Sequence, residues 1–170
     1  MKNLSLIAAM GKNHEIGLDN HLLWHIPEDL QFYKKMTWGK NVVVGRNTLF
    51  SMPAKAFEGR VAYVLSPDKL DVNFDVNSFD NMKSLLDFIE SREEEFMVIG
   101  GASMYEQFLP YVDTMYLTEI DEYFDADTFF PYFNEEEFDV ELMGEYNYNE
   151  LKYKRNKYTR KKVKEWENLL

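Results

Sequence analysis

Short apolar runs alternate with segments of helical spacing through the first two thirds of the chain. Runs of β-branched and other apolar residues that stop at a glycine or proline predict buried strands. Such runs occupy residues 4–10, 41–44, 60–66, 96–99 and 114–120. Helical spacing predicts helices that begin at 27 and 46 and cover 78–90 and 102–109. Strands and helices that alternate in this way form a mostly parallel sheet with helices on both faces.

The last third of the chain lacks this alternation. Residues 121–127 form an acidic loop, and the segments 138–146 and 151–158 predict an antiparallel hairpin at one edge of the sheet. Residues 11–18, near the start, are predicted to form a polar loop. Because no linker interrupts the pattern and 170 residues fit one domain, we expect a single α/β domain with a central sheet of about eight strands.

Composition narrows the class of protein. With 45% hydrophobic and 16% aromatic residues, the chain has ample material for a core, which excludes a disordered protein. The lack of cysteine excludes disulfide scaffolds, thiolate metal sites and a cysteine nucleophile, and it fits a reducing compartment. No apolar run approaches the ~20 residues that span a bilayer, and no signal-peptide pattern is present. A cytoplasmic protein without a membrane partner is therefore expected.

The charge is distributed unevenly. The net charge is −11, yet residues 152–164 hold eight basic residues and no acidic one, which leaves −19 on the remainder. An acidic body is a poor partner for nucleic acid, whose phosphates attract cations. The basic stretch is therefore interpreted as a solvated final strand or tail that offsets the acidic body, and no nucleic-acid partner is expected.

Two strand-to-helix turns could bind phosphate. The first is Gly45-Arg46-Asn47-Thr48 and the second is Gly100-Gly101-Ala102-Ser103. Unpaired N–H groups at such turns suit an anion, and glycines let the backbone approach a pyrophosphate closely. Two such turns side by side would cradle a dinucleotide at the carboxyl edge of the sheet. Glycine also ends strands for plain turn reasons, and neither the Rossmann nor the Walker fingerprint is present.

Asp29 is the acidic residue with the most unusual surroundings. It falls in the first turn of the helix that begins at Pro27, close in sequence to Trp24 and Tyr33. A carboxylate among aromatic residues could pair with a cationic or amide-like ring edge. It could equally be a dipole-compensating first-turn acid like Glu28, and position alone favours that interpretation.

The other titratable clusters do not predict a metal site. His21 and His25 have the spacing of a metal pair, but Leu22 stands where a zincin needs its glutamate. The acidic loop 121–127 lacks the glycine and the closing glutamate of a calcium loop.

Taken together, these segments closely resemble dihydrofolate reductase of the bacterial type over essentially the whole chain. The matching motifs are Leu6-Ile7-Ala8-Ala9, Ile16-Gly17, Leu23-Trp24-His25-Ile26-Pro27-Glu28-Asp29-Leu30, Gly45-Arg46-Asn47-Thr48, Gly59-Arg60, Val98-Ile99-Gly100-Gly101, Tyr105-Glu106-Gln107, Tyr116-Leu117-Thr118 and Asp127-Thr128-Phe129-Phe130-Pro131. The order and spacing of the motifs make the resemblance specific.

The resemblance implies NADPH-dependent reduction of 7,8-dihydrofolate to tetrahydrofolate by a monomer that also binds antifolates. It assigns Asp29, Trp24 and Thr118 to catalysis. It implies that Arg60 binds the glutamate α-carboxylate as a bidentate fork. The implied substrate residues are Ile7, Leu22, Asp29, Leu30, Tyr33, Met52, Phe57, Arg60, Ile99, Tyr105 and Thr118.

The resemblance also implies a cofactor site. An adenosine-binding subdomain would cover roughly residues 41–91, and the loop 11–23 would close on the nicotinamide. The implied cofactor residues are Ala9, Ile16, Gly17, Gly45, Arg46, Asn47, Thr48, Ser66, Gly100, Gly101, Ala102, Ser103, Met104 and Gln107. Pro67 and Ser103 stand where relatives carry cations or donors, so most 2′-phosphate recognition is assigned to Arg46.

Two alternatives remain open at this point. One is a related reductase that acts on another pyrimidine- or pterin-like ring, as in riboflavin synthesis. The other is a non-catalytic dinucleotide-binding module, which would keep the glycine turns but would not need Asp29. The carboxylate at Asp29 and the guanidinium at Arg60 favour folate, because a pterin and a glutamate tail use both.

Overall fold

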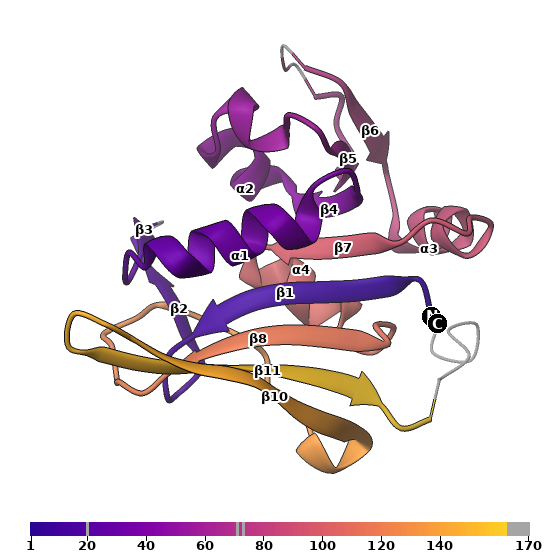
Figure 1. Cartoon of the computed structure of the whole chain (residues 1–170). Coiled ribbons are helices and arrows are strands. Elements are labelled where there is room, and N and C mark those ends of the chain that lie inside the picture. Colours follow the sequence, from indigo (N-terminus) through magenta and orange to yellow (C-terminus); the bar gives the residue numbers. More distant parts are fainter. Residues whose placement is uncertain (20, 71, 73, 163–170) are drawn as a thin grey trace.

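The computed structural model describes residues 1–19, 21–70, 72 and 74–162. Its main sheet contains β1 (Leu4–Met10), β4 (Asn41–Gly45), β5 (Val61–Leu65), β6 (Val76–Phe79), β7 (Phe96–Gly100), β8 (Thr114–Ile120), β10 (Phe138–Tyr148) and β11 (Leu151–Arg160). The order across the sheet is β10-β11-β8-β1-β7-β4-β5-β6 (Figure 1). Neighbours from β8 to β6 pair in parallel, whereas β11 pairs antiparallel with β8 and β10. The predicted mostly parallel sheet with a C-terminal antiparallel hairpin is confirmed.

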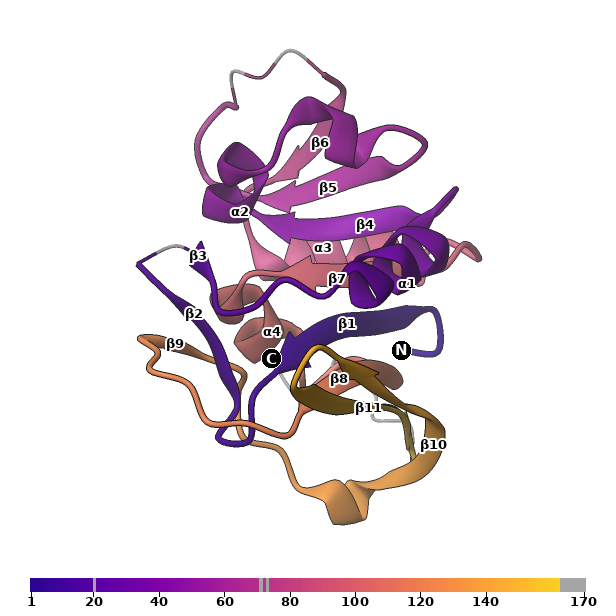
Figure 2. The same cartoon turned by 60° about the vertical axis from the view of Figure 1, so that its left-hand side comes forward.

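Helices cover both faces of this sheet. Helices α1 (Pro27–Thr37) and α2 (Arg46–Ser51) lie on one face, and α3 (Met82–Glu90) and α4 (Ala102–Phe108) lie on the other (Figure 2). Side chains of β4 alternate accordingly: Val43 joins the cluster that contains Leu85 of α3, and Val44 joins the cluster that contains Leu49 of α2. Within the described residues, no helix is long and apolar enough to cross a membrane.

Two predicted elements differ from the structure. The helix predicted over 78–90 is replaced by edge strand β6 followed by α3, because Asn81 caps the helix by accepting a hydrogen bond from the Ser84 N–H at 2.9 Å. The polar loop predicted over 11–18 contains β2 (Glu15–Leu18). This strand pairs with β3 (His21–Leu22) and β9 (Thr128–Phe129) in a second sheet. Short 3₁₀ helices cover Ala54–Phe57 and Glu135–Glu137.

The basic stretch near the C-terminus forms the predicted final strand, and its lysines at 152, 154, 161 and 162 are exposed, but two of its arginines are not solvated as predicted. Arg155 and Arg160 lie on β11 with only 1% and 7% of their surface exposed. Arg160 donates hydrogen bonds to the carbonyl oxygens of Val112 and Leu109, at 3.0 and 2.8 Å, which compensates for its burial. Lys164, which the prediction included, lies outside the described residues.

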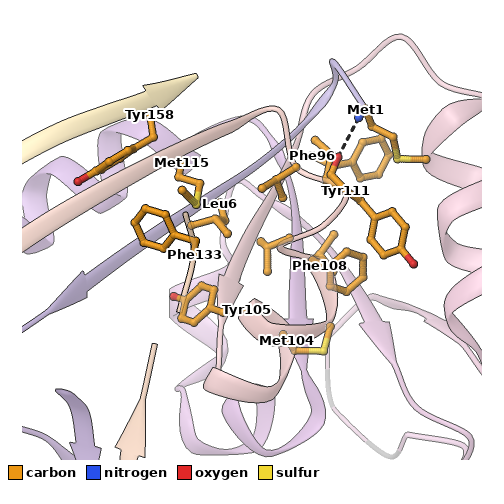
Figure 3. Packing of buried hydrophobic residues seen from close by; sticks show 14 of the residues in the cluster. Met1, Leu6, Phe96, Met104, Tyr105, Phe108, Tyr111, Met115, Phe133 and Tyr158 are labelled. Carbon is orange, nitrogen blue, oxygen red and sulfur yellow. Dashed lines mark hydrogen bonds between the residues drawn. The ribbon is translucent and has the colours of Figure 1, made fainter. Parts of the chain in front are cut away.

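The largest core cluster fills the face covered by α3 and α4 (Figure 3). Aromatic rings pack edge to face within it: the Phe133 and Tyr158 centroids are 5.4 Å apart at 82°. The amino group of Met1 donates a 2.8 Å hydrogen bond to the Tyr111 carbonyl and so ties the start of the chain to this core. Packing on both faces holds the carboxyl ends of the parallel strands in place, and the candidate site lies at those ends.

Candidate active site

Apolar contacts with the sheet fix the start of α1. Ile26, the residue before the helix, is 3% exposed and packs with Ile120 and Tyr153. Pro27 begins the helix with a backbone angle that suits its first turn. The Asp29 N–H donates to the Ile26 carbonyl at 3.1 Å. The position of the Asp29 carboxylate is therefore fixed by its own helix turn and by the sheet beneath it.

Asp29 and Thr118 are brought together although they are far apart in the chain. The Thr118 hydroxyl on β8, which is 2% exposed, donates a 2.6 Å hydrogen bond to Asp29 Oδ1. Ala9 lies beside Thr118 in the register of β1 and β8. Trp24 lies just before α1 and packs against Phe124, with ring centroids 5.3 Å apart.

Arg155 is the residue of this cluster that the sequence prediction missed. Its Nη2 lies 2.9 Å from both Asp29 Oδ1 and Glu28 Oε1, and its Nε donates to Thr118 Oγ1 at 3.1 Å. The Tyr153 hydroxyl also donates to Glu28 Oε1, at 2.8 Å. The alternation of β11 could have revealed it, since Tyr153 and Arg155 are buried while Lys154 between them is exposed.

The pKa values of the cluster reflect these contacts. Burial disfavours the charged guanidinium of Arg155, but its hydrogen bonds to Glu28 and Asp29 outweigh burial and raise its pKa. Burial likewise opposes the charge on Glu28, but hydrogen bonds from Arg155 and Tyr153 lower its pKa overall. Glu28 is thus an ion-pair partner rather than only a helix-dipole acid.

The predicted substrate residues differ in exposure. The Tyr105 hydroxyl donates to the Ile7 carbonyl at 2.8 Å, and burial raises the Tyr105 pKa. The Tyr33 hydroxyl is buried and has no hydrogen-bond partner among the described residues, and burial raises its pKa. Leu22 and Leu30 are 73% and 43% exposed, so both apolar side chains are available to a ligand.

Arg60 is oriented by three hydrogen bonds. Its Nε donates to Thr37 Oγ1 at 2.8 Å, while Nη1 and Nη2 donate to the carbonyls of Glu58 and Lys34 at 2.8 and 3.0 Å. A guanidinium has five N–H groups, so one remains on each terminal nitrogen. A carboxylate fork uses one N–H from each of two guanidinium nitrogens, and Arg60 retains that number of donors.

The other predicted substrate residues in this region are packed against apolar neighbours. Phe57 is 5% exposed and stacks on Phe74 with centroids 5.1 Å apart. Met52 packs on the same cluster, as does Ile99.

The two predicted phosphate turns lie side by side, as expected. Parallel pairing of β4 and β7 sets Val44 opposite Gly100. A Cβ on Gly101 would come within 2.9 Å of Thr48 Oγ1, and a Cβ on Gly45 within 2.9 Å of Met104 Cγ. A side chain at either glycine would displace Thr48 or Met104, so glycine allows the two turns to pack closely together.

Polar side chains around these turns are engaged with one another. Arg46 forms a 2.9 Å ion pair with Asp68, and both side chains are largely exposed. The Ser66 hydroxyl donates to the Asp68 carbonyl at 3.1 Å. Gln107 Nε2 donates to the carbonyl and the hydroxyl of Ser103, at 3.2 and 3.0 Å. The remaining predicted cofactor residues sit on strand β2 or beside these turns: Ile16, Gly17, Asn47 and Ala102.

A doubly covered parallel sheet with paired glycine turns at the carboxyl ends of its strands defines an α/β protein of the nucleotide-binding class. The family model described as dihydrofolate reductase matches residues 3–161. The chain belongs to the dihydrofolate reductase family.

Individual relatives agree with this assignment. Dihydrofolate reductase of Haemophilus influenzae is 39% identical over 138 residues, which cover 81% of this chain and 84% of that protein. The Bacillus subtilis enzyme is 40% identical over 133 residues, covering 78% of this chain and 77% of that protein. A structure of Enterococcus faecalis dihydrofolate reductase, complexed with NADP(H) and RAB-propyl, superposes with a TM-score of 0.81 at 25% identity and covers 94% of this chain and 96% of that one. The predicted family and enzyme class are confirmed.

Proposed function

We propose that this protein reduces 7,8-dihydrofolate to 5,6,7,8-tetrahydrofolate with NADPH. The observation that carries the proposal is the Asp29 carboxylate, which Thr118 and Arg155 hold at the carboxyl edge of the sheet. Both protein donors bind Oδ1, and no donor among the described residues reaches Oδ2. Such a carboxylate can accept hydrogen bonds from the 2-amino group and the N3–H of a pterin.

The cofactor proposal rests on the paired glycine turns. A Cβ on Gly45 would lie 3.6 Å from the Gly101 nitrogen, so the two turns adjoin, and adjoining glycine turns at helix N-termini suit the pyrophosphate of a dinucleotide. Arg46 would bind the 2′-phosphate, with Thr48 and Ser103 nearby. We assign the adenosine-binding subdomain to roughly residues 41–91. Bound NADPH supplies the hydride that reduces C6 of the pterin.

The protein's own part in the reaction is orientation and proton supply. Asp29 binds the pyrimidine edge of the ring and so fixes which face of the pterin meets the cofactor. N5, which gains the proton, lies at the edge of the pterin away from Asp29, so a water molecule delivers the proton. The negative charge of the Asp29 carboxylate raises the basicity of N5 across the ring. Arg60 binds the glutamate α-carboxylate through its two remaining N–H groups.

A spectrophotometric assay tests the proposal. NADPH oxidation on addition of dihydrofolate, blocked by a diaminopyrimidine antifolate, is the expected result. A ribosylated aminopyrimidine offered in parallel is expected to give no turnover. Turnover of that compound alone would assign the protein to another ring reductase. Bound NADPH with no loss of nicotinamide absorbance would indicate a binding module.

We further propose that the protein acts as a monomer in the cytoplasm and binds no nucleic acid. The predicted pterin, glutamate and cofactor residues come from the two sheets and the helices of one chain, and the proposed site needs no residue of a second copy. Light scattering at assay concentrations is expected to give the mass of a single chain. An oligonucleotide titration at low salt, where electrostatic binding is strongest, is expected to show no binding.

A further inference from the structure

The guanidinium of Arg155 lies between two acidic residues, Glu28 and Asp29, in the first turn of α1. Arg155 donates from Nη1 to Glu28 Oε2 at 3.1 Å, and its Nη2 is 2.9 Å from both Glu28 Oε1 and Asp29 Oδ1. The Arg155 side chain is 2% exposed. A cation at this depth is costly unless it is paired and hydrogen-bonded, and here all three of its nitrogens bind oxygen, the third being Nε on Thr118.

The plane of this guanidinium is also fixed. Its Cζ lies 3.8 Å from the centroid of the Phe32 ring, a close cation–π contact, and 5.2 Å from that of Tyr146. Arg155, Glu28 and both rings line a hollow of about 370 Å³ between α1 and the C-terminal hairpin. Glu28, 43% exposed, lies on this hollow, whereas Asp29 does not line it. Arg155 therefore bridges an outer acid and the acid proposed to bind the pterin.

We propose that Arg155 is a positioning residue that sets both the orientation and the effective charge of the Asp29 carboxylate. This inference rests on the proposed reduction of dihydrofolate. By binding Oδ1 together with Thr118, Arg155 turns Oδ2 toward the ring edge. Its positive charge also partly compensates the carboxylate, so the site is less able to attract the proton that the reaction requires.

The other ionisable groups around the carboxylate divide between α1, β11, β10 and α4. Glu28 on α1 adds a negative charge that opposes the effect of Arg155. Tyr153 on β11, Tyr146 on β10 and Tyr105 on α4 are phenols near the acids or the guanidinium. Burial raises the pKa values of Tyr153 and Tyr105, so both stay neutral in the pH range of the assay. Lys35 on α1 lines the same hollow as Glu28 and Arg155, and Tyr33 on α1 is a further phenol near Tyr105. The charged groups in hydrogen-bond contact within the cluster are the cation Arg155 and the anions Glu28 and Asp29.

The test is the pH dependence of the hydride step. The rate, isolated by stopped flow with deuterated NADPH, is expected to fall as pH rises because N5 of the bound substrate is protonated less often. Arg155→Met removes the charge but keeps an apolar side chain of similar length. The pH of half-maximal rate is then expected to rise by about one unit, because the positive Arg155 disfavours a second positive charge on protonated N5 and nearby charges shift titrations by about 1–3 units.

Three further variants separate charge from structure. Glu28→Gln removes the anion and is expected to shift the half-rate pH in the opposite direction, downward. Arg155→Lys keeps the charge and is expected to leave the profile within about 0.3 units of wild type. Lys154→Met removes an equal charge from the exposed neighbouring position on β11, where solvent and salt screen it, and is expected to leave the profile unchanged.

The outcomes are distinguishable. A purely structural role for Arg155 would lower the melting temperature and the maximal rate without moving the half-rate pH, and that result overturns the inference. If Arg155→Met does not fold, Arg155→Gln, which removes the charge but keeps hydrogen-bonding groups, is measured instead: an upward shift of the half-rate pH supports the inference and an unchanged profile overturns it. If wild-type protein itself does not oxidise NADPH with dihydrofolate, the proposed function fails instead.

Discussion

Thr37 accepts a 2.8 Å hydrogen bond from Arg60 Nε and donates one of 2.8 Å to the carbonyl of Tyr33. The threonine is fully buried in the last turn of α1, so it fixes the guanidinium relative to the helix that carries Asp29. A substrate held by Asp29 at one end and by Arg60 at the other is therefore bound between two groups with a rigid connection.

This arrangement predicts that replacing Arg60 weakens substrate binding rather than chemistry. In Arg60→Lys the fork becomes a point charge. We expect KM for dihydrofolate to rise about 30-fold, since one lost charge-assisted hydrogen bond is worth about 2 kcal/mol. The value of kcat is expected to change less than about threefold. A dihydropterin without the glutamate tail serves as the control substrate, and its KM is expected to stay the same. An unchanged KM for dihydrofolate would show that Arg60 does not bind the tail.

Asp29→Asn is expected to reduce turnover by about two orders of magnitude or more. The amide has one acceptor oxygen, and its NH₂ group either faces Arg155 or meets the donors of the pterin, which leaves a polar group unpaired in both orientations. The dissociation constant of NADPH, followed by protein fluorescence, is expected to change less than about twofold because the glycine turns are untouched. Near-normal turnover on dihydrofolate would refute the assignment.

The ion pair between Arg46 and Asp68 predicts how cofactor preference responds to mutation. Asp68 occupies the guanidinium that we assign to the 2′-phosphate. Asp68→Asn is expected to raise the ratio of kcat/KM for NADPH over NADH by up to about fivefold, the scale of an exposed ion pair of at most ~1 kcal/mol. Arg46→Ala is expected to lower the same ratio about tenfold or more. If the ratio is unchanged in Arg46→Ala, another residue recognises the phosphate.

The central strands and the glycine turns were predictable because their signals are local. The run of valines before Gly45 and the run before Gly100 mark strands that end at a turn, and parallel pairing then brings the turns together. Edge strand β6 was missed because only two of its four residues, Val76 and Phe79, are apolar, none is buried, and Ser78 and Phe79 fall within the stretch of helical spacing. β2 was missed because polar residues flank its short apolar pattern on both sides, and because its partner β9 lies more than 100 positions away in the chain.

Arg155 was missed for a different reason. The net charge of residues 152–164 does not show which basic side chains are buried. In a strand, alternate side chains point to opposite faces of the sheet, so some of them can be buried and others exposed. That alternation places Arg155 on the same face as buried Tyr153, but it does not reveal the compensating acids, which lie on α1 more than 120 positions away. Tertiary contacts therefore determine the charge balance at Asp29, whereas Asp29 itself was singled out by the resemblance of its motif and not by its position in the helix.

Glu15 gives a prediction for stability and its pH dependence. Its carboxylate is 2% exposed and accepts backbone N–H groups at both ends: Asn13 on Oε1, and Phe124 on Oε2 at 2.6 Å. Burial opposes the charge, but the hydrogen bonds from Phe124 and Asn13 prevail and lower the Glu15 pKa. A folded-state pKa below the unfolded one stabilises the fold above the unfolded value, and this contribution is lost as pH falls through the folded value.

Glu15→Gln replaces one of these acceptor oxygens with an NH₂ group that faces a backbone donor. The free energy of unfolding at pH 7 is expected to fall by about 1–3 kcal/mol, the cost of leaving a buried donor unpaired. Because Glu15 becomes protonated in acid, the difference between wild type and variant is expected to narrow below about pH 4. Urea unfolding at several pH values measures it, with the exposed Glu122→Gln as a control of the same charge change. A stability difference that stays constant from neutral to acid pH would show that the contribution of Glu15 does not depend on its charge.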